Sequence, residues 1–206
     1  MIERDAVRRG YDEVADVWAD ERSETEGEAS VLESALEPLP SSVRILDVGC
    51  GQGTPALERV GDEATVVGLD FSRRQLEGAT SNVPEASFVQ GDMTRLPVAN
   101  DSFDVVTAFY SLIHVPSAEH RTVLEEFARV VRPSGRLLVS EGVEPWSGTN
   151  SDWLDSGAEM QWDIAGAEAT RTRLREAGFT IEAEHELRGV LTEGEHWIFF
   201  DARPAG

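Results

Sequence analysis

Three glycines and one carboxylate mark the segment of this chain with the clearest chemistry. The run Ile45–Thr54 is apolar at first and then carries glycine at alternate positions, Gly49, Gly51 and Gly53. Glycine lets a chain turn sharply from strand to helix and lets a ligand touch the backbone without meeting a Cβ. Asp70 ends the next apolar run, about 20 residues further on, where a βαβ unit places a carboxylate against ribose hydroxyls. The pattern predicts a site for a nucleoside-bearing cofactor.

Two classes of cofactor fit such a loop. Gly51, Gly53 and Ala56 also satisfy the G-x-G-x-x-A form of a dinucleotide fingerprint. Asp47, however, lies at the end of the strand before the first glycine. A carboxylate there favours a cationic ligand and repels a pyrophosphate at a helix N-terminus. We therefore favour a positively charged cofactor and keep an NAD(P)-dependent oxidoreductase as the alternative.

The same residues resemble the class I S-adenosylmethionine-dependent methyltransferases, in particular the small-molecule branch of ubiquinone and menaquinone methyltransferases. Asp47 and the three glycines match that family's D-x-G-x-G-x-G pattern. Gly91-Asp92-Met93, followed by Leu96-Pro97, resembles its G-D-x-x-x-L-P segment, which a nicotinamide enzyme does not need. The resemblance implies that Asp92 meets the adenine amino group and that Met93 lies along the ring.

The resemblance continues over roughly residues 10 to 203. Tyr11 to Trp18 resembles the helix that lies over the cofactor, and Phe109 to His114 the loop after the fourth strand. The segment ending at Gly135 resembles the family's L-x-P-G-G, with Ser134 in place of the first glycine. The residues expected at the S-adenosylmethionine site are Tyr11, Trp18, Asp47, Gly49, Cys50, Gly51, Asp70, Phe71, Gln75, Asp92, Met93 and Phe109. Cys50 is expected to act there as a small loop residue and not as a nucleophile.

Methyl transfer from a sulfonium is an in-line displacement of an activated group, so positioning the acceptor about 3 Å from the methyl carbon does most of the work. An acceptor that arrives protonated needs a base. His114, at the mouth of the fourth strand, is the candidate, since its ordinary pKa of about 6.5 suits proton transfer near neutrality. The alternative is that His114 only shapes the pocket wall. Because no side chain is obligatory, a non-catalytic S-adenosylmethionine-binding protein is a further alternative.

The acceptor pocket is expected from the N-terminal helices and from Gly142–Ile164, since both are additions to the cofactor core. Four of the five Trp lie in the C-terminal third of the chain, which favours a flat or apolar small-molecule acceptor. The expected pocket residues are Tyr110, Met160, Trp162, His196 and Trp197.

The elements that must position these residues alternate between strand and helix. This predicts an α/β fold, a three-layer α/β/α sandwich around a Rossmann-like, seven-stranded, mostly parallel sheet with an antiparallel last strand. The expected strands are 43–48, 65–70, 87–90, 103–109, 135–141, 179–187 and 196–202, and the expected helices 7–21, 29–36, 54–60, 73–81, 118–131 and 168–177. A turn is expected over 188–195 and a solvated loop over 21–28. The expected organisation is one domain over 1–206, with a helical cap (1–40), a cofactor core (41–141), a substrate-side insertion (142–164) and a last helix with a hairpin (165–206).

The charge of the chain is strongly negative. The 39 acidic residues outnumber 18 basic ones, all of them Arg, for a formal net charge of -21. Such a chain needs counterions, which predicts an organism with molar intracellular salt; the alternative is a merely acidic protein from a high-GC genome. Full stability at low ionic strength would contradict the first prediction. Without a dense basic stripe, nucleic acid is not expected as substrate.

The remaining composition excludes several kinds of site. One Cys makes no internal disulfide, and four scattered His predict no metal site. Neither a signal peptide nor a membrane span is visible, so we expect a cytoplasmic monomer or homodimer.

Overall fold

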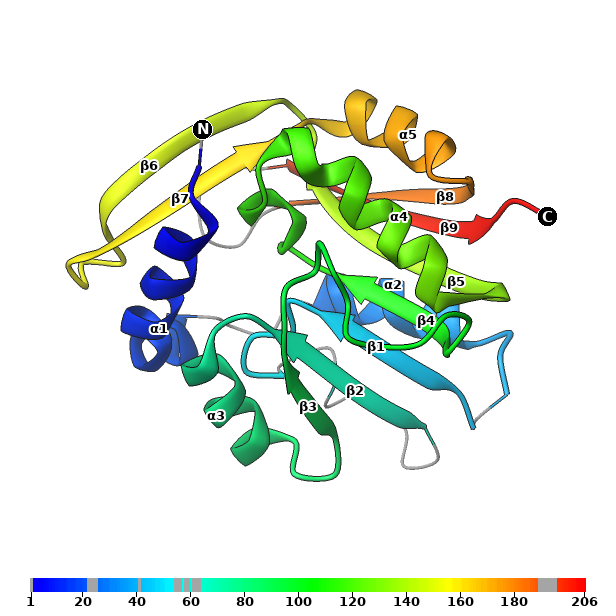
Figure 1. Cartoon of the computed structure of the whole chain (residues 1–206), viewed down its shortest axis with the longest axis horizontal. Coiled ribbons are helices and arrows are strands. Elements are labelled where there is room, and N and C mark those ends of the chain that lie inside the picture. The colour runs from blue at the N-terminus through cyan, green and yellow to red at the C-terminus, as the bar shows by residue number, and fades with distance from the viewer. Residues whose placement is uncertain are drawn as a thin grey trace.

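The computed structural model describes residues 2–21, 26–40, 42–53, 57, 60, 64–188 and 196–206. Its centre is a seven-stranded sheet with the order β3–β2–β1–β4–β5–β9–β8 (Figure 1). β9 runs antiparallel to both β5 and β8, while the other neighbours are parallel. This confirms the predicted mostly parallel sheet with an antiparallel last strand. The strands are β1 Arg44–Val48, β2 Thr65–Asp70, β3 Ser87–Gln90, β4 Phe103–Ala108, β5 Val131–Gly142, β8 Phe179–Arg188 and β9 His196–Pro204.

Helices cover both faces of this sheet. α2 (Glu26–Leu36) packs on one face, over β1, β4, β5 and β9, and α3 (Arg73–Asn82) packs on the same face over β2 and β3. α4 (His120–Val130) and α5 (Ala167–Glu176) pack on the opposite face. The predicted three-layer arrangement is therefore confirmed. The chain order reverses between β1 and β4, and ligands of open α/β sheets bind at such a point, beyond the carboxyl ends of the strands.

Several element boundaries differ from those expected. β5 begins at Val131 and not at Gly135, because Val131 pairs with Phe103 before an irregularity in the register. A 3-10 turn, Ser117–Glu119, precedes α4, which therefore starts later than expected. The helix expected over 54–60 and the turn expected beyond Arg188 fall largely outside the described residues.

Two additions stand at the carboxyl ends of the strands. α1 (Arg4–Glu21) lies beside a separate antiparallel ribbon formed by β6 (Trp146–Trp153) and β7 (Ala158–Ile164), as Figure 1 shows. Gly10 allows the close approach of α1 to β7, because a Cβ at this position would lie 2.3 Å from the carbonyl oxygen of Glu159. The expected insertion is thus an ordered ribbon, which the polar, glycine-containing sequence did not indicate.

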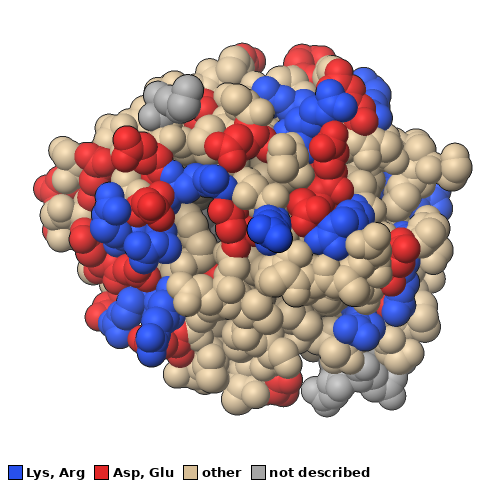
Figure 2. Space-filling view, viewed as in Figure 1, with Lys and Arg blue, Asp and Glu red and all other residues tan. Residues whose placement is uncertain are grey.

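Positive and negative side chains are interleaved on the face seen in Figure 2, where Arg side chains lie among Asp and Glu. Arg129 is paired with Glu126 at 2.7 Å, and Arg74 with Asp16 at 3.1 Å. Ion pairs of this kind neutralise individual Arg side chains locally in a chain with a large excess of acid.

A buried polar cluster lies where β5 ends. His120 and Glu141 are fully buried, with Nδ1 and Oε2 3.7 Å apart. His120 Nε2 donates to the Val115 carbonyl at 3.0 Å, so Nδ1 carries no proton in the neutral ring. Thr170 Oγ1 lies 3.3 Å from Glu141 Oε2, and the Gly142 N–H donates to Oε1 at 3.0 Å. Burial raises the pKa of Glu141 to about 7 and lowers the pKa of His120 to about 4, so below about pH 7 a protonated Glu141 faces a neutral His120, whose Nδ1 also lies 3.5 Å from Arg173 Nη1.

Glu141→Gln should make stability less dependent on pH. Because the folded-state pKa of Glu141 lies above its ordinary value of 4.5, its contribution to stability is complete below about pH 4.5 and is lost as pH rises through about 7. Gln keeps the shape of the side chain but does not titrate. We expect the change in unfolding free energy between pH 5 and pH 8, measured by urea titration, to differ from that of the wild type by about 2 kcal/mol in favour of the variant at pH 8.

The matched control for that measurement is Glu184→Gln. The Arg171 guanidinium holds the pKa of Glu184 below its ordinary value, so its contribution is lost only at more acid pH. This control should therefore keep the wild-type difference between pH 5 and pH 8, and an equal response of the two variants would contradict the account of Glu141.

Candidate active site

A cavity of about 1130 Å³ opens at the carboxyl ends of the strands, between the sheet, α1 and the β6–β7 ribbon. Most of the residues predicted for the site lie on its wall: Tyr11, Trp18, Gly49, Gly51, Asp70, Phe71, Asp92, Met93, Phe109, Tyr110, His114, Trp162, His196 and Trp197. Asp47, Cys50, Gln75 and Met160 do not line it. One cavity therefore collects the predicted cofactor and acceptor residues from distant parts of the sequence.

The glycine loop forms the floor of the cavity next to β1. Gly49, Gly51 and Gly53 have φ angles of 77°, 52° and 81°, a region that side-chain-bearing residues rarely adopt. A Cβ on Gly49 would lie 2.3 Å from the Cβ of Ser111, so this turn can pack only as glycine. A Cβ on Gly51 would instead meet only Gln75 Oε1, at 3.7 Å, which leaves the Gly51 backbone open to a ligand.

Asp70 lies directly beside this loop. Its Oδ2 accepts from the Gly51 N–H at 2.9 Å and its Oδ1 from the Ser72 N–H at 2.8 Å. Burial raises the pKa of Asp70 to about 6, assisted by the nearby charge of Asp47 and opposed by the two backbone hydrogen bonds. Asp70 is thus a buried acceptor with both oxygens oriented by the backbone, suited to receive hydroxyl donors.

Asp47 and Cys50 support the loop from behind. Asp47 is buried, and its Oδ1 accepts from Thr107 Oγ1 at 2.6 Å, which orients the carboxylate between β1 and β4. Cys50 is buried in a cluster with Leu76, and its sulfur would lie 2.8 Å from a Cβ on Gly68. The Cys50 side chain therefore packs against the sheet, as a small residue does.

Gln75 carries an unsatisfied polar atom next to the glycine loop. Its Nε2 donates to the Tyr11 carbonyl at 3.3 Å, while Oε1, fully buried, has no hydrogen-bond partner among the described residues. A buried amide oxygen without a hydrogen-bond donor costs free energy, so a donor supplied by a bound ligand would stabilise this atom.

Asp92 follows β3 on the far side of Asp70. Its Oδ1 accepts from the backbone N–H and the Oγ1 of Thr94, at 2.8 and 2.7 Å. Its Oδ2 accepts from Arg4 Nη1 at 2.7 Å, and Arg4 also lies 3.5 Å from Glu119. Arg4 therefore links the start of α1 to Asp92. It also lines the cavity, which the sequence did not indicate.

Tyr11 and His114 form a hydrogen-bonded pair on the cavity wall. The Tyr11 hydroxyl lies 2.9 Å from His114 Nε2, and His114 Nδ1 lies 3.0 Å from the Gln161 carbonyl oxygen. A carbonyl only accepts, so Nδ1 carries the ring proton and Nε2 accepts from the Tyr11 hydroxyl. Burial lowers the pKa of His114 to about 4, so the imidazole is neutral at pH 7.

Aromatic side chains form the rest of the wall. Tyr110 has a φ of 52° and packs edge-on against Trp197, with ring centroids 4.7 Å apart. Trp162 lies 5.7 Å from Trp153 and 6.1 Å from Trp146 on the ribbon. A strained backbone at Tyr110 is retained where several flat rings line one space, as is common at binding sites.

Glu28 is a wall residue at which the sequence interpretation was wrong. The segment 21–28 was expected as a solvated loop, but Glu21 ends α1, Glu28 belongs to α2, and residues 22–25 lie outside the described part. The Glu28 side chain is 1% exposed and lines the cavity. Its acidic neighbours in sequence concealed it, because a stretch rich in Glu is typical of a solvated loop.

Met160 is also placed differently from the expectation. It is fully buried and packs in the cluster of α1 and the ribbon, with Val14, Trp18 and Trp153. It supports the cavity wall without forming it: it shares a face of β7 with the wall residue Trp162, but α1 packs over it near Gly10.

The described residues contain no group of three or more His, Cys, Asp or Glu arranged to hold a metal ion. None of the helices they form is both long enough and apolar enough to cross a membrane.

Comparisons with known proteins bear on this site directly. A family model described as a methyltransferase domain matches residues 45–135. The chain is 32% identical over 200 residues to 27-O-demethylrifamycin SV methyltransferase of Amycolatopsis mediterranei, with 86% of this chain and 67% of that protein covered. It is 30% identical over 197 residues to demethylmenaquinone methyltransferase of Lactococcus lactis, and the match covers 80% of this chain and 76% of that protein.

The fold is similar to that of solved structures. The crystal structure of the [4+2]-cyclase SpnF matches with a TM-score of 0.75 over 98% of this chain and 97% of that chain, at 22% identity. By its sequence relatives and its sheet order, the chain belongs to the S-adenosylmethionine-dependent methyltransferases.

Proposed function

We propose that this methyltransferase methylates a small, flat and largely apolar acceptor bound in the aromatic part of the cavity. The observation that carries the proposal is the single cavity of about 1130 Å³ that joins the glycine loop to the aromatic wall. A pocket for one drug-sized ligand has about 300–1,000 Å³, so this cavity is large enough for a cofactor and an acceptor side by side.

The residues of the loop side fit S-adenosylmethionine. The open Gly51 backbone provides a surface that a Cβ would fill, and Gln75 Oε1 lacks a donor beside it. Asp70 would accept from the ribose hydroxyls, and Asp92 with Met93 would border the adenine. Asp47 and Asp70 place negative charge near the floor, which favours a cationic cofactor. When bound, S-adenosylmethionine supplies an activated methyl group.

The residues of the acceptor side fit a flat molecule. Tyr110, Trp162 and Trp197 present rings, and His196 pairs with Glu186 at the rim, 2.9 Å between nitrogen and oxygen. The names of the two sequence relatives give a rifamycin and a menaquinone precursor as acceptors of those proteins. Both names support a small-molecule acceptor for this chain.

The proposed chemistry needs little from the side chains beyond position. Tyr11 would orient an acceptor hydroxyl through its own hydroxyl oxygen while its proton points to His114 Nε2. As the bond to the methyl carbon forms, the acceptor proton becomes strongly acidic. It can then pass to the Tyr11 oxygen while the Tyr11 proton passes to His114, even though burial holds the pKa of His114 low. His114 is therefore proposed as the final proton acceptor.

The test has two steps, both in molar KCl to screen the acidic surface. Calorimetric titration with S-adenosylmethionine, S-adenosylhomocysteine and NADH should give micromolar binding of the first two and none of NADH. Incubation with S-adenosylmethionine and either demethylmenaquinone or 27-O-demethylrifamycin SV should then give an acceptor heavier by one methyl group in the mass spectrum. Binding without transfer to these or any other flat acceptor would contradict the proposal, and SpnF, named for a cyclisation, shows why turnover must be measured.

A further inference from the structure

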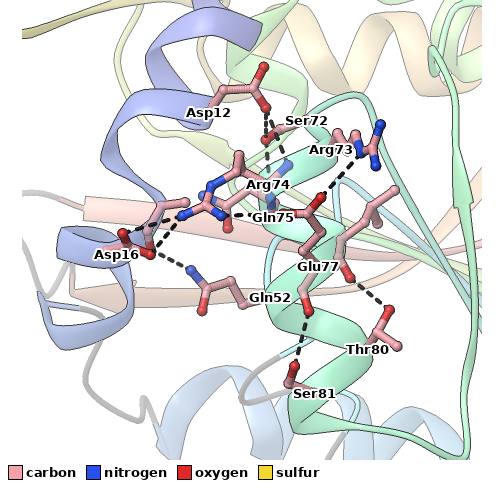
Figure 3. Close-up of polar contacts among 12 residues, drawn as sticks. Asp12, Asp16, Gln52, Ser72, Arg73, Arg74, Gln75, Glu77, Thr80 and Ser81 are labelled. Carbon is pink, nitrogen blue, oxygen red and sulfur yellow. Dashed lines mark hydrogen bonds and ion pairs between the residues drawn. The ribbon is translucent and has the colours of Figure 1, made fainter.

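Asp12 is an acidic residue of α1 that neither lines the cavity nor belongs to the predicted site. Figure 3 shows its side chain directed at the start of α3. Asp12 Oδ1 accepts from Ser72 Oγ at 2.7 Å and lies 3.3 Å from the Arg74 backbone nitrogen, which donates to it. Arg8, one turn earlier on α1, holds Oδ2 at 2.8 Å. The carboxylate is thus fixed between two helices that are far apart in sequence.

The start of α3 requires such a partner. Ser72 is its N-cap, and Ser72 Oγ accepts from the Gln75 N–H at 3.2 Å. The first turn contains no acidic residue and begins with Arg73 and Arg74, two cations at the end of a helix that favours negative charge. Asp12 supplies the missing negative charge and accepts a second orphan N–H of the turn. The local sequence of α3 is therefore completed by a residue of α1.

The start of α3 also orients Asp70, the carboxylate that we propose accepts from the ribose hydroxyls. Ser72 donates its backbone N–H to Asp70 Oδ1 and its hydroxyl to Asp12 Oδ1. One residue thus links the two carboxylates, one through its backbone and one through its side chain. A shift of Ser72 would disturb the orientation of Asp70, because the Ser72 N–H is one of the backbone donors that hold its carboxylate.

Asp12 also stands next to a wall residue. Tyr11 lines the cavity, and its carbonyl accepts from Gln75 Nε2 at 3.3 Å, on the same helix that Asp12 caps. The bonds from Asp12 and Gln75 therefore fix α1 to α3 at the level of the cofactor site. Nearer the end of α1, by contrast, Arg74 and Asp16 meet as a surface ion pair, with 91% of the Asp16 side chain exposed (Figure 3).

We propose that Asp12 is a positioning residue for cofactor binding, which caps α3 from α1 and thereby fixes Asp70 and the Tyr11 wall together. The inference rests on the proposed function, since it assigns the cofactor to this side of the cavity. Asp12 need not contact the ligand. Its contribution is to hold in the ligand-free protein the geometry that the ligand requires, which reduces the cost of binding.

The experiment compares Asp12→Ala, Asp12→Asn and Asp16→Ala. Calorimetry with S-adenosylhomocysteine should show about tenfold weaker binding for Asp12→Ala, the effect expected from losing a helix cap. Asp12→Asn keeps an oxygen that accepts and should bind within about threefold of the wild type. Asp16→Ala removes only an exposed ion pair and should change binding less than twofold.

A second readout needs no cofactor. Hydrogen exchange of the ligand-free variants should show faster exchange of the Arg74 and Gln75 amides in Asp12→Ala, but not in Asp16→Ala. Equal exchange and equal binding for these two variants would overturn the inference. If the folded wild type does not bind S-adenosylhomocysteine at all, the proposed function and the inference about binding both fail, while the exchange rates still report whether Asp12 caps α3.

Discussion

Asp70→Ala is expected to weaken S-adenosylhomocysteine binding by at least about 100-fold at pH 7.5. The wild-type carboxylate is buried and oriented by the Gly51 and Ser72 N–H groups, and we propose that it accepts from two ribose hydroxyls. Hydrogen bonds to a charged group contribute about 1.5–3 kcal/mol each, so the loss of two corresponds to at least about 3 kcal/mol. Calorimetric titration in molar KCl measures the loss, and thermal unfolding of the ligand-free variant confirms that it is folded.

The pH dependence of binding provides an independent check on Asp70. Burial raises its pKa to about 6 in the ligand-free protein, while the ionised form is the one expected to bind hydroxyl donors. Protonation then competes with the ligand below about pH 6, and affinity should fall about tenfold per further pH unit. Asp70→Asn should lack this slope between pH 5 and pH 7. A slope that persists in the Asn variant would assign the titration to another group and contradict the role of Asp70.

The cofactor half of the site was largely predictable because it is encoded locally. Gly49, Gly51 and Asp70 each follow directly from a strand that ends at the same edge of the sheet, and a parallel sheet brings such ends together. The order of the sheet follows from the same alternation. Sequence spacing therefore indicated both the fold and the floor of the cavity.

The rest of the cavity depends on contacts between distant segments, which the spacing of residues in the sequence does not indicate. Arg4 donates a hydrogen bond to Asp92, which lies 88 positions away in the sequence. Glu28 is buried although it stands in an acidic stretch of the sequence. Met160 was expected on the wall, but α1, which is distant in sequence, packs over it. The Tyr11–His114 pair spans 103 positions, so the sequence named both residues without indicating that they meet.

Tyr11→Phe is expected to lower kcat about 100-fold while leaving the affinity for S-adenosylmethionine within about threefold of the wild type. The variant keeps the ring, and therefore its packing against Trp18 and Trp153, but removes the hydroxyl that lies 2.9 Å from His114 Nε2. General acid–base catalysis contributes about 10²–10⁴-fold, and the proposed proton path runs through this oxygen. Single-turnover measurements with the acceptor identified by mass spectrometry separate the chemical step from binding.

His114→Asn tests the far end of the same path. It should lower kcat by a similar factor, and the double variant should lose little more than either single one, because the two residues act as a unit. His185→Asn, on β8 and away from the cavity, is the matched control and should leave kcat unchanged. Unchanged turnover in His114→Asn would reject the role of His114 as proton acceptor.

The pH profile of kcat tests whether the pKa of His114 stays low in the working enzyme. Burial lowers the pKa of His114 to about 4, so kcat at saturating cofactor should stay level down to about pH 5 and should not follow the ordinary imidazole pKa near 6.5. The fall below pH 6 should appear only in kcat/KM for the cofactor, because it belongs to Asp70. A kcat that titrates near pH 6.5 and loses that titration in His114→Asn would mean that the imidazole is solvated in the working enzyme, against the buried geometry from which its low pKa follows.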